Sequence, residues 1–157
     1  MGWHEYYERK AALDTVVADG LTVPAGFDGE DEVLLALHHR WSMRLAGRVD
    51  LAVHDIERDP DIDPVDAVGA AWRATAESEP DLRRLLDEHA EHPALRAVTL
   101  AEQAMLARAA GLTEQADGAA EQAAVGAAFL ALVRSRPGRA ERRNPVERLL
   151  RRLVPSA

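Results

Sequence analysis

Histidine and carboxylate side chains gather in one short segment and are the first candidates for metal chemistry. Glu88, His89, Glu91 and His92 follow one another within about a helical turn. A metal site needs ligands that converge from several directions, and Pro93 is expected to end the helix here. We therefore interpret the cluster as a solvated helix end, where a histidine also interacts favourably with the helix dipole, with metal binding as the alternative.

Two further polar residues lie on faces that are otherwise apolar. His38 shares a helical stripe with Leu34, Trp41 and Leu45, and Glu102 is surrounded by apolar residues on a helical wheel. A buried carboxylate must be paired, protonated or next to a cavity. Glu102 is therefore expected either to pair with an arginine of a neighbouring helix or to line a ligand pocket between helices. The candidate ligand-binding residues are His38, Trp41, Trp72, Glu102 and Phe129.

No catalytic constellation can be recognised from residue spacing. The absence of cysteine excludes disulfides, thiolate chemistry and Cys-ligated metals. No glycine-rich phosphate loop follows a strand, and no nucleophile–base pair can be identified. The sequence therefore favours a binding protein without a cofactor over an enzyme. An enzyme or metal protein that uses His38, Glu102 or the pair His89 and His92 is the alternative.

The charge is distributed unevenly along the chain. Residues 134–157 contain eight arginines and two glutamates and have a net charge of +6. Because the whole chain has a net charge of −8, residues 1–133 have a net charge of −14. An acidic body disfavours general nucleic-acid binding. There is neither an apolar signal segment at the N-terminus nor a stretch of about 20 apolar residues that could span a membrane. We therefore expect a cytoplasmic protein.

Proline, glycine and capping residues divide the chain into six or seven predicted helices. The pattern predicts an all-α fold, either orthogonal or bundle-like, because it contains no strand periodicity. We expect a helical core over residues 1–133, a basic linker over 134–144 and a short amphipathic helix over 145–157. The first expected helix covers about residues 4–19, and the second, a long one, is capped by Asp28 and ends near Arg58. The third begins at Asp63-Pro64, and a short fourth begins at Ser78–Asp81. The fifth ends at Ala110, and the sixth begins near Thr113.

Two surfaces are candidates for contacts with other chains. Small residues on the sixth predicted helix, such as Gly118 and Gly126, allow close packing either within the monomer or in a homodimer. The C-terminal helix begins at a capping box at Asn144. It is expected to pack its leucine face on the body, to bind a protein partner, or to contact a membrane or nucleic acid. Its candidate partner-binding residues are Arg148, Leu149, Arg151, Arg152 and Leu153.

Residues 27–133 resemble the regulatory domain of TetR-family repressors. The run from Phe27 to Leu37 is similar to the passage that joins the DNA-binding and regulatory domains in that family. The runs that begin at Asp63, Pro80 and Ala101 resemble the helices that follow. Only 26 residues precede Phe27, too few for the helix-turn-helix of such repressors. The resemblance therefore implies a ligand-sensing or dimerising core without its DNA-binding head. Either a small apolar ligand between its helices or a protein partner at the small-residue face or the basic tail is expected.

Overall fold

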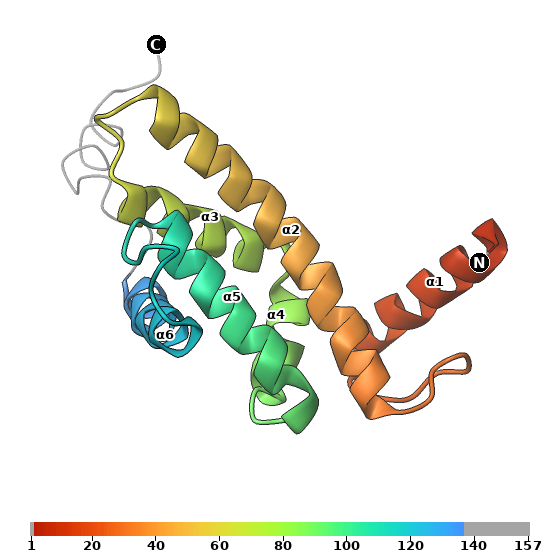
Figure 1. The fold of residues 1–157 in the computed structure, drawn as a ribbon. Helices are drawn as coiled ribbons and strands as arrows, with labels where there is room; N and C mark the ends of the chain where they lie inside the picture. Colours follow the sequence, from red (N-terminus) through yellow and green to blue (C-terminus); the bar gives the residue numbers. More distant parts are fainter. Residues whose placement is uncertain (1, 137–157) are drawn as a thin grey trace, which may run out of the picture.

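A computed structural model describes residues 2–136 of the chain, and every regular element in this range is helical. The all-α prediction is thus confirmed. The elements are α1 (Trp3–Asp19), α2 (Glu30–Arg58), α3 (Pro64–Ser78), α4 (Pro80–Glu88), a 3-10 turn η1 (Pro93–Leu95), α5 (Arg96–Ala109) and α6 (Ala119–Ser135). The long helix α2 runs diagonally through the structure, and α3, α4 and α5 pack along it. α6 packs on the side of α5 that faces away from α2 (Figure 1).

The core forms along the apolar stripe of α2. Its buried residues recur every three or four positions and include Leu34, Leu37, Trp41 and Leu45, none of which is exposed. The chain then turns at Asp59-Pro60 and enters α3 with the expected cap. The Asp63 carboxylate accepts a hydrogen bond from the Asp66 amide at 2.9 Å, and Pro64 occupies the first helical position.

Two helix starts differ from the sequence prediction. Gly29, not Asp28, caps α2, and the Asp28 amide instead donates to the Glu32 carboxylate at 2.7 Å. α6 begins at Ala119, not near Thr113. The Gln122 side chain donates to the carbonyls of Glu114 and Asp117, at 3.0 and 2.8 Å, and so holds the preceding residues in a turn. Side-chain hydrogen bonds of this kind compete with helix formation.

The small residues of α6 are used at least in part inside the monomer. α5 and α6 form the most extensive helix pair of the described residues, and Gly126 lies directly against the main chain of Gln103. A Cβ atom on Gly126 would come within 2.8 Å of the Gln103 Cα and closer still to its carbonyl group. Of the two interpretations of this face, the structure thus supports packing within the chain at Gly126.

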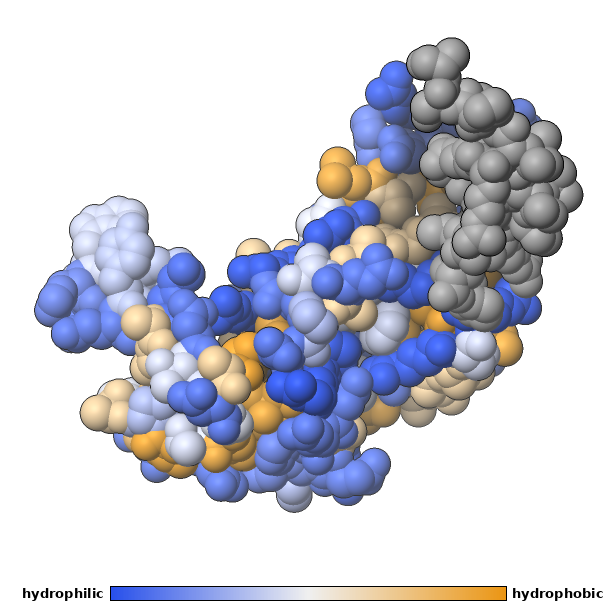
Figure 2. All heavy atoms as spheres, turned by 180° about the vertical axis from the view of Figure 1, so that it is seen from behind, coloured by the Kyte–Doolittle hydropathy of each residue, from blue (hydrophilic) through white to orange (hydrophobic). Residues whose placement is uncertain are grey.

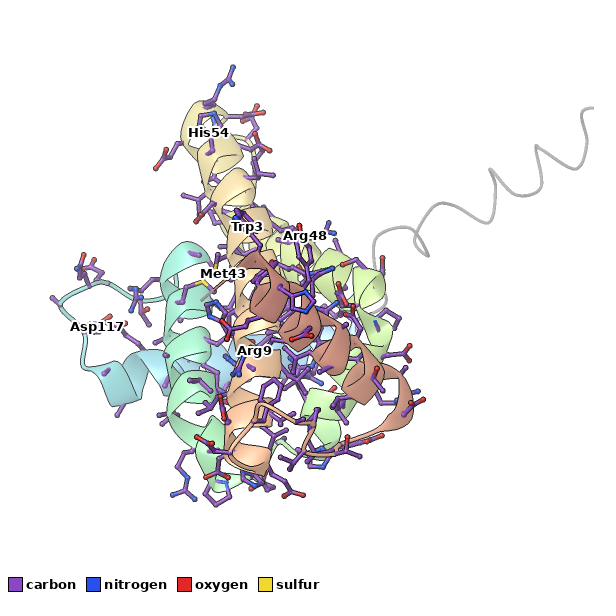
Figure 3. The ribbon with its side chains drawn as sticks, turned by 90° about the vertical axis from the view of Figure 1, so that its right-hand side faces the viewer. Trp3, Arg9, Met43, Arg48, His54 and Asp117 are labelled. Carbon is purple, nitrogen blue, oxygen red and sulfur yellow. The ribbon has the colours of Figure 1, made fainter. Side chains whose placement is uncertain are left out.

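Helix α1 is anchored by its second half and by Arg9, which pairs with Glu32 at 2.6 Å and lies over the Phe27 ring. Leu13 and Val16 are buried against the body, whereas the first turns stand away from it and expose Trp3, Tyr6 and Tyr7 (Figures 1 and 2). Figure 3 shows Trp3 on this projecting part, in front of α2. Among the described helices, none combines the length and the apolar character that crossing a membrane requires.

Candidate functional site

Glu102 of α5 is the centre of a polar cluster between α2 and α5. Its Oε2 atom accepts a hydrogen bond from Trp41 Nε1 at 3.0 Å and lies 3.2 Å from His38 Nε2. The other imidazole nitrogen of His38, Nδ1, is 3.1 Å from the Ser42 hydroxyl. A neutral His38 with its proton on Nε2 satisfies both contacts, because it donates to Glu102 and accepts from Ser42. The positions 38, 41 and 42 share one face of α2, so that His38 and Trp41 both reach the Glu102 carboxylate while Ser42 reaches His38.

These contacts answer why a carboxylate occurs on an apolar helix face. The sequence predicted either an arginine partner or a cavity, and the described residues show neither in direct contact with Glu102. Its side chain is 10% exposed and is satisfied by an indole and an imidazole. The prediction of an arginine partner was therefore wrong, because the partners are Trp41 and His38. The physical reason for expecting a partner holds, since a buried carboxylate needs hydrogen-bond donors.

A second layer of charges covers the tryptophans. Trp41 and Trp72 meet edge to face, with ring centroids 5.9 Å apart. The guanidinium of Arg83 lies 4.6 Å from the Trp41 ring centroid, and that of Arg134 lies 4.8 Å from the Trp72 centroid. Both distances fit cation–π contacts. α4 and α6 are thereby held over the aromatic pair by one arginine each.

Asp87 joins the two arginines. It accepts hydrogen bonds from Arg83 Nε at 3.1 Å and from both terminal nitrogens of Arg134 at 3.1 and 2.9 Å. Burial alone would raise the pKa of Asp87, but the hydrogen bonds and charges of the two arginines outweigh burial and lower it. Burial lowers the pKa of Arg83, against the opposing charges of Asp87 and Glu102. Asp87 and Glu102 thus balance the formal charges of the two arginines, and the network joins the five helices α2 to α6.

Four of the five predicted ligand-binding residues meet in this cluster, but they fill the space between them. His38, Trp41 and Glu102 are in direct contact, and Trp72 packs on Trp41. None of these four lines the hollow between α3 and α6 or the hollow at residues 28–32. Phe129, the fifth, is buried under a separate groove. His38, Trp41, Trp72 and Glu102 therefore form a packed core cluster, and Phe129 lies outside it.

That separate hollow is a surface groove between α3 and α6, with a volume of about 480 Å³. Its lining mixes apolar with charged side chains, and the aspartates form an acidic rim along the N-terminal turn of α3. We call it the α3–α6 groove. It is lined by Asp61, Ile62, Asp63, Val65, Asp66, Ala67, Gly69, Ala70, Arg73, Phe129, Leu132, Val133 and Arg136. This size lies within the range of about 300–1,000 Å³ that ligand sites occupy.

The charges at this end of the molecule are mostly negative. Residues 55–66 contain six acidic residues and one arginine, so this acidic end carries a net charge of −5. Asp61 and Asp66 are exposed, and neither makes an ion pair with another described residue. Arg73 and Arg136 are the basic members of the lining. The groove therefore combines exposed carboxylates with an apolar surface to which Leu132, 55% exposed, contributes most openly.

The histidine cluster near Pro93 is structural in the described chain. His89 Nδ1 lies 2.9 Å from the Leu85 carbonyl, and His92 Nδ1 accepts a hydrogen bond from the Ala94 amide at 3.2 Å. Both imidazoles thus serve the end of α4 and the start of η1. Across residues 2–136, no three histidine or carboxylate side chains converge in an arrangement that could hold a metal ion.

The predicted partner-binding residues Arg148, Leu149, Arg151, Arg152 and Leu153 lie outside the described residues. One feature of the sequence points to the groove, namely the alternation of aspartate with apolar residues between Asp59 and Asp66. By itself that run indicates helix-capping chemistry, which Asp63 does provide. Its role as a groove wall depends on α6 and has no local signature.

Comparison with known proteins returned no relative: no protein-family model, no curated protein and no solved structure matches this chain. The class that can be stated is therefore the architectural one, an all-helical fold with a packed polar core and an open groove. The resemblance of residues 27–133 to TetR-family regulatory domains stays a prediction.

Proposed function

We propose that this protein is a non-catalytic interaction protein that binds a cationic amphipathic helix of a partner protein in the α3–α6 groove. The observation that carries the proposal is that apolar side chains and exposed aspartates line the same groove, with the aspartates on one rim. Helix-in-groove recognition places the apolar face of a partner helix in such a groove. Opposite charges at the rim then orient the partner and speed its association.

The core favours this function over the sensing of a small molecule. A sensor needs a pocket among Trp41, Trp72 and Glu102, whereas these side chains contact one another directly or through Trp41. A partner that docks at the surface needs no such cavity. Binding of a small apolar ligand and formation of a homodimer remain predictions from sequence, and the described contacts add no support to either.

The chemistry of the groove also sets the expected energetics. Val65, Ala70 and Leu132 offer apolar surface beside the buried side chains of Phe129 and Val133. Burying such surface contributes about 25 cal/mol per Å² before the cost of association is subtracted. A groove of this size with one charged rim is suited to reversible binding at micromolar or weaker affinity, as in a regulatory contact.

The test is a titration followed by methyl NMR. The probe is a synthetic 14-residue peptide with leucines at helical spacing and arginines elsewhere, and the control peptide carries glutamate in place of each arginine. Both are added to the full-length protein and to the variant Leu149→Asp/Leu153→Asp, so that an intramolecular competitor cannot conceal the groove. We expect shifts at the methyl groups of Val65, Leu132 and Val133 with the arginine peptide alone.

Matched variants separate the groove from the general surface. Leu132→Asp should weaken binding at least tenfold, since it places a charge on the apolar wall. Leu100→Asp changes a leucine of similar exposure on α5, outside the groove, and should leave binding unchanged. Asp61→Asn/Asp66→Asn should weaken binding and reduce its salt dependence. Equal effects of the two leucine variants, or no binding to either protein at millimolar peptide, would refute the proposed function.

A further inference from the structure

We infer that the groove has an occupant in the same chain: the C-terminal segment, residues 144–157, docks in cis into the α3–α6 groove and competes with the partner. The inference rests on the proposed function, because it assigns a regulator to the same groove. It follows from the place where the described chain ends, from the charge of the two parts and from the apolar pattern of the segment.

The described part of the chain ends at the groove. Arg136, the last described residue, is itself part of the groove lining. The seven residues 137–143 then connect it to Asn144 and can span at most about 25 Å. The part of the groove wall that α3 forms extends from Val65 to Arg73, about 13 Å of helix. Every part of the groove is therefore within reach of the segment.

The charges of the two parts are complementary. Residues 137–157 contain six arginines and two glutamates, a net charge of +4. The acidic end, residues 55–66, carries −5 and supplies the rim aspartates of the groove. Opposite net charges on tethered parts of one chain attract each other within a Debye length of about 8 Å at physiological salt. The groove and the segment therefore have the charge match that the proposed partner also needs.

The apolar pattern of the segment fits the groove. The sequence predicts a capping box at Asn144 and a helix in which Val146, Leu149, Leu150 and Leu153 recur at spacings of three and four. The predicted helix, 145–153, would be about 14 Å long, close to the length of the α3 wall. A helix this short is marginal by itself and gains stability by packing its apolar face. The groove offers apolar residues at the matching length.

Tethering makes the intramolecular contact dominant. A short tether gives an effective concentration of about 1 mM, so a segment that binds with a Kd of about 100 µM would reduce the affinity of a competing peptide about tenfold. A partner must then displace the segment, and any change that weakens the segment opens the groove. The C-terminal segment would thus be an autoinhibitory element of the interaction surface.

Cysteine crosslinking tests where the segment lies, since the natural chain has no cysteine. The full-length variant Leu132→Cys/Leu149→Cys should form an intramolecular disulfide under mild oxidation, seen as a monomer that migrates faster without reductant. The matched variant Leu100→Cys/Leu149→Cys should crosslink at least tenfold more slowly. Adding Arg148→Glu, Arg151→Glu and Arg152→Glu to the first variant keeps the tether but should slow its crosslinking by a similar factor.

The peptide titration then separates the two proposals. If the segment occupies the groove, Leu149→Asp/Leu153→Asp should bind the arginine peptide about tenfold more tightly than the natural chain does. Equal binding by both proteins would overturn the inference and leave the proposed function standing. Absence of binding by both would overturn the function itself. Crosslinked dimers, or equal crosslinking at positions 132 and 100, would also overturn docking in cis.

Discussion

Substitution of Gly126 by alanine tests the packing of α5 on α6. The new Cβ atom would lie within 2.8 Å of the Gln103 Cα and closer to its carbonyl group, so the two helices must move apart. Main chain cannot yield as a side-chain end can, and overpacking costs about 1–3 kcal/mol or more. The better helix propensity of alanine returns about 1 kcal/mol. We expect a net loss of about 2 kcal/mol in the free energy of unfolding.

Urea and thermal unfolding followed by circular dichroism measure this loss. For a domain of this size, a loss of about 2 kcal/mol corresponds to a decrease in Tm of roughly 6–12 °C. Gly47→Ala is the matched control, because Gly47 lies within α2 and its Cβ would meet no atom within 4 Å. That variant should gain about 0.5–1 kcal/mol. A Gly126→Ala protein as stable as the natural chain would refute the close packing of α5 on α6.

Two predictions concern the polar core, each checked by unfolding experiments. Trp41→Phe removes the donor to Glu102, whereas Trp72→Phe removes an indole N–H without a hydrogen-bond partner among the described residues; the first should cost about 1–3 kcal/mol more, and equal losses would contradict the hydrogen bond. The pKa of Asp87 is lowered in the folded state, so its stabilising contribution exists above its unfolded-state pKa and disappears as the pH falls through the lower folded-state value. The stability difference between the natural chain and Asp87→Asn should therefore shrink below about pH 4, and a constant difference down to about pH 2 would contradict the pairing.

The helices could be predicted because their boundaries are local. Pro64 and Asp63 define the start of α3 by their own geometry, and Gly111 follows α5 with a φ of 69°, which favours glycine. The start of α6 could not be predicted from the same reasoning. Gln122 reaches back to two carbonyls before the helix, and this long side-chain contact outweighed the capping pattern at Thr113.

The candidate site could be predicted only in part, for a related reason. An unusual carboxylate at Glu102 was visible in the sequence, and so was the polar position of His38 on α2. Their direct contact depends on how α5 crosses α2, which no local pattern encodes. The α3–α6 groove could not be predicted from the sequence, because the run from Asp59 to Asp66 is fully explained by a turn and a helix cap. Only the approach of α6 turns it into a wall.

The pairing of helices also has a consequence for how the chain reaches its native state. The two most extensive pairs, α2 with α3 and α5 with α6, each join neighbours in sequence across a short connection. Such local pairs close quickly and place the protein among the fast-folding, low-contact-order topologies. The Glu102 cluster and the Asp87 arginine pair bring these two hairpins and α4 together. We therefore expect the side chains of the Glu102 cluster and of the Asp87 arginine pair to lose their water in the final step of folding, when the two helix pairs dock.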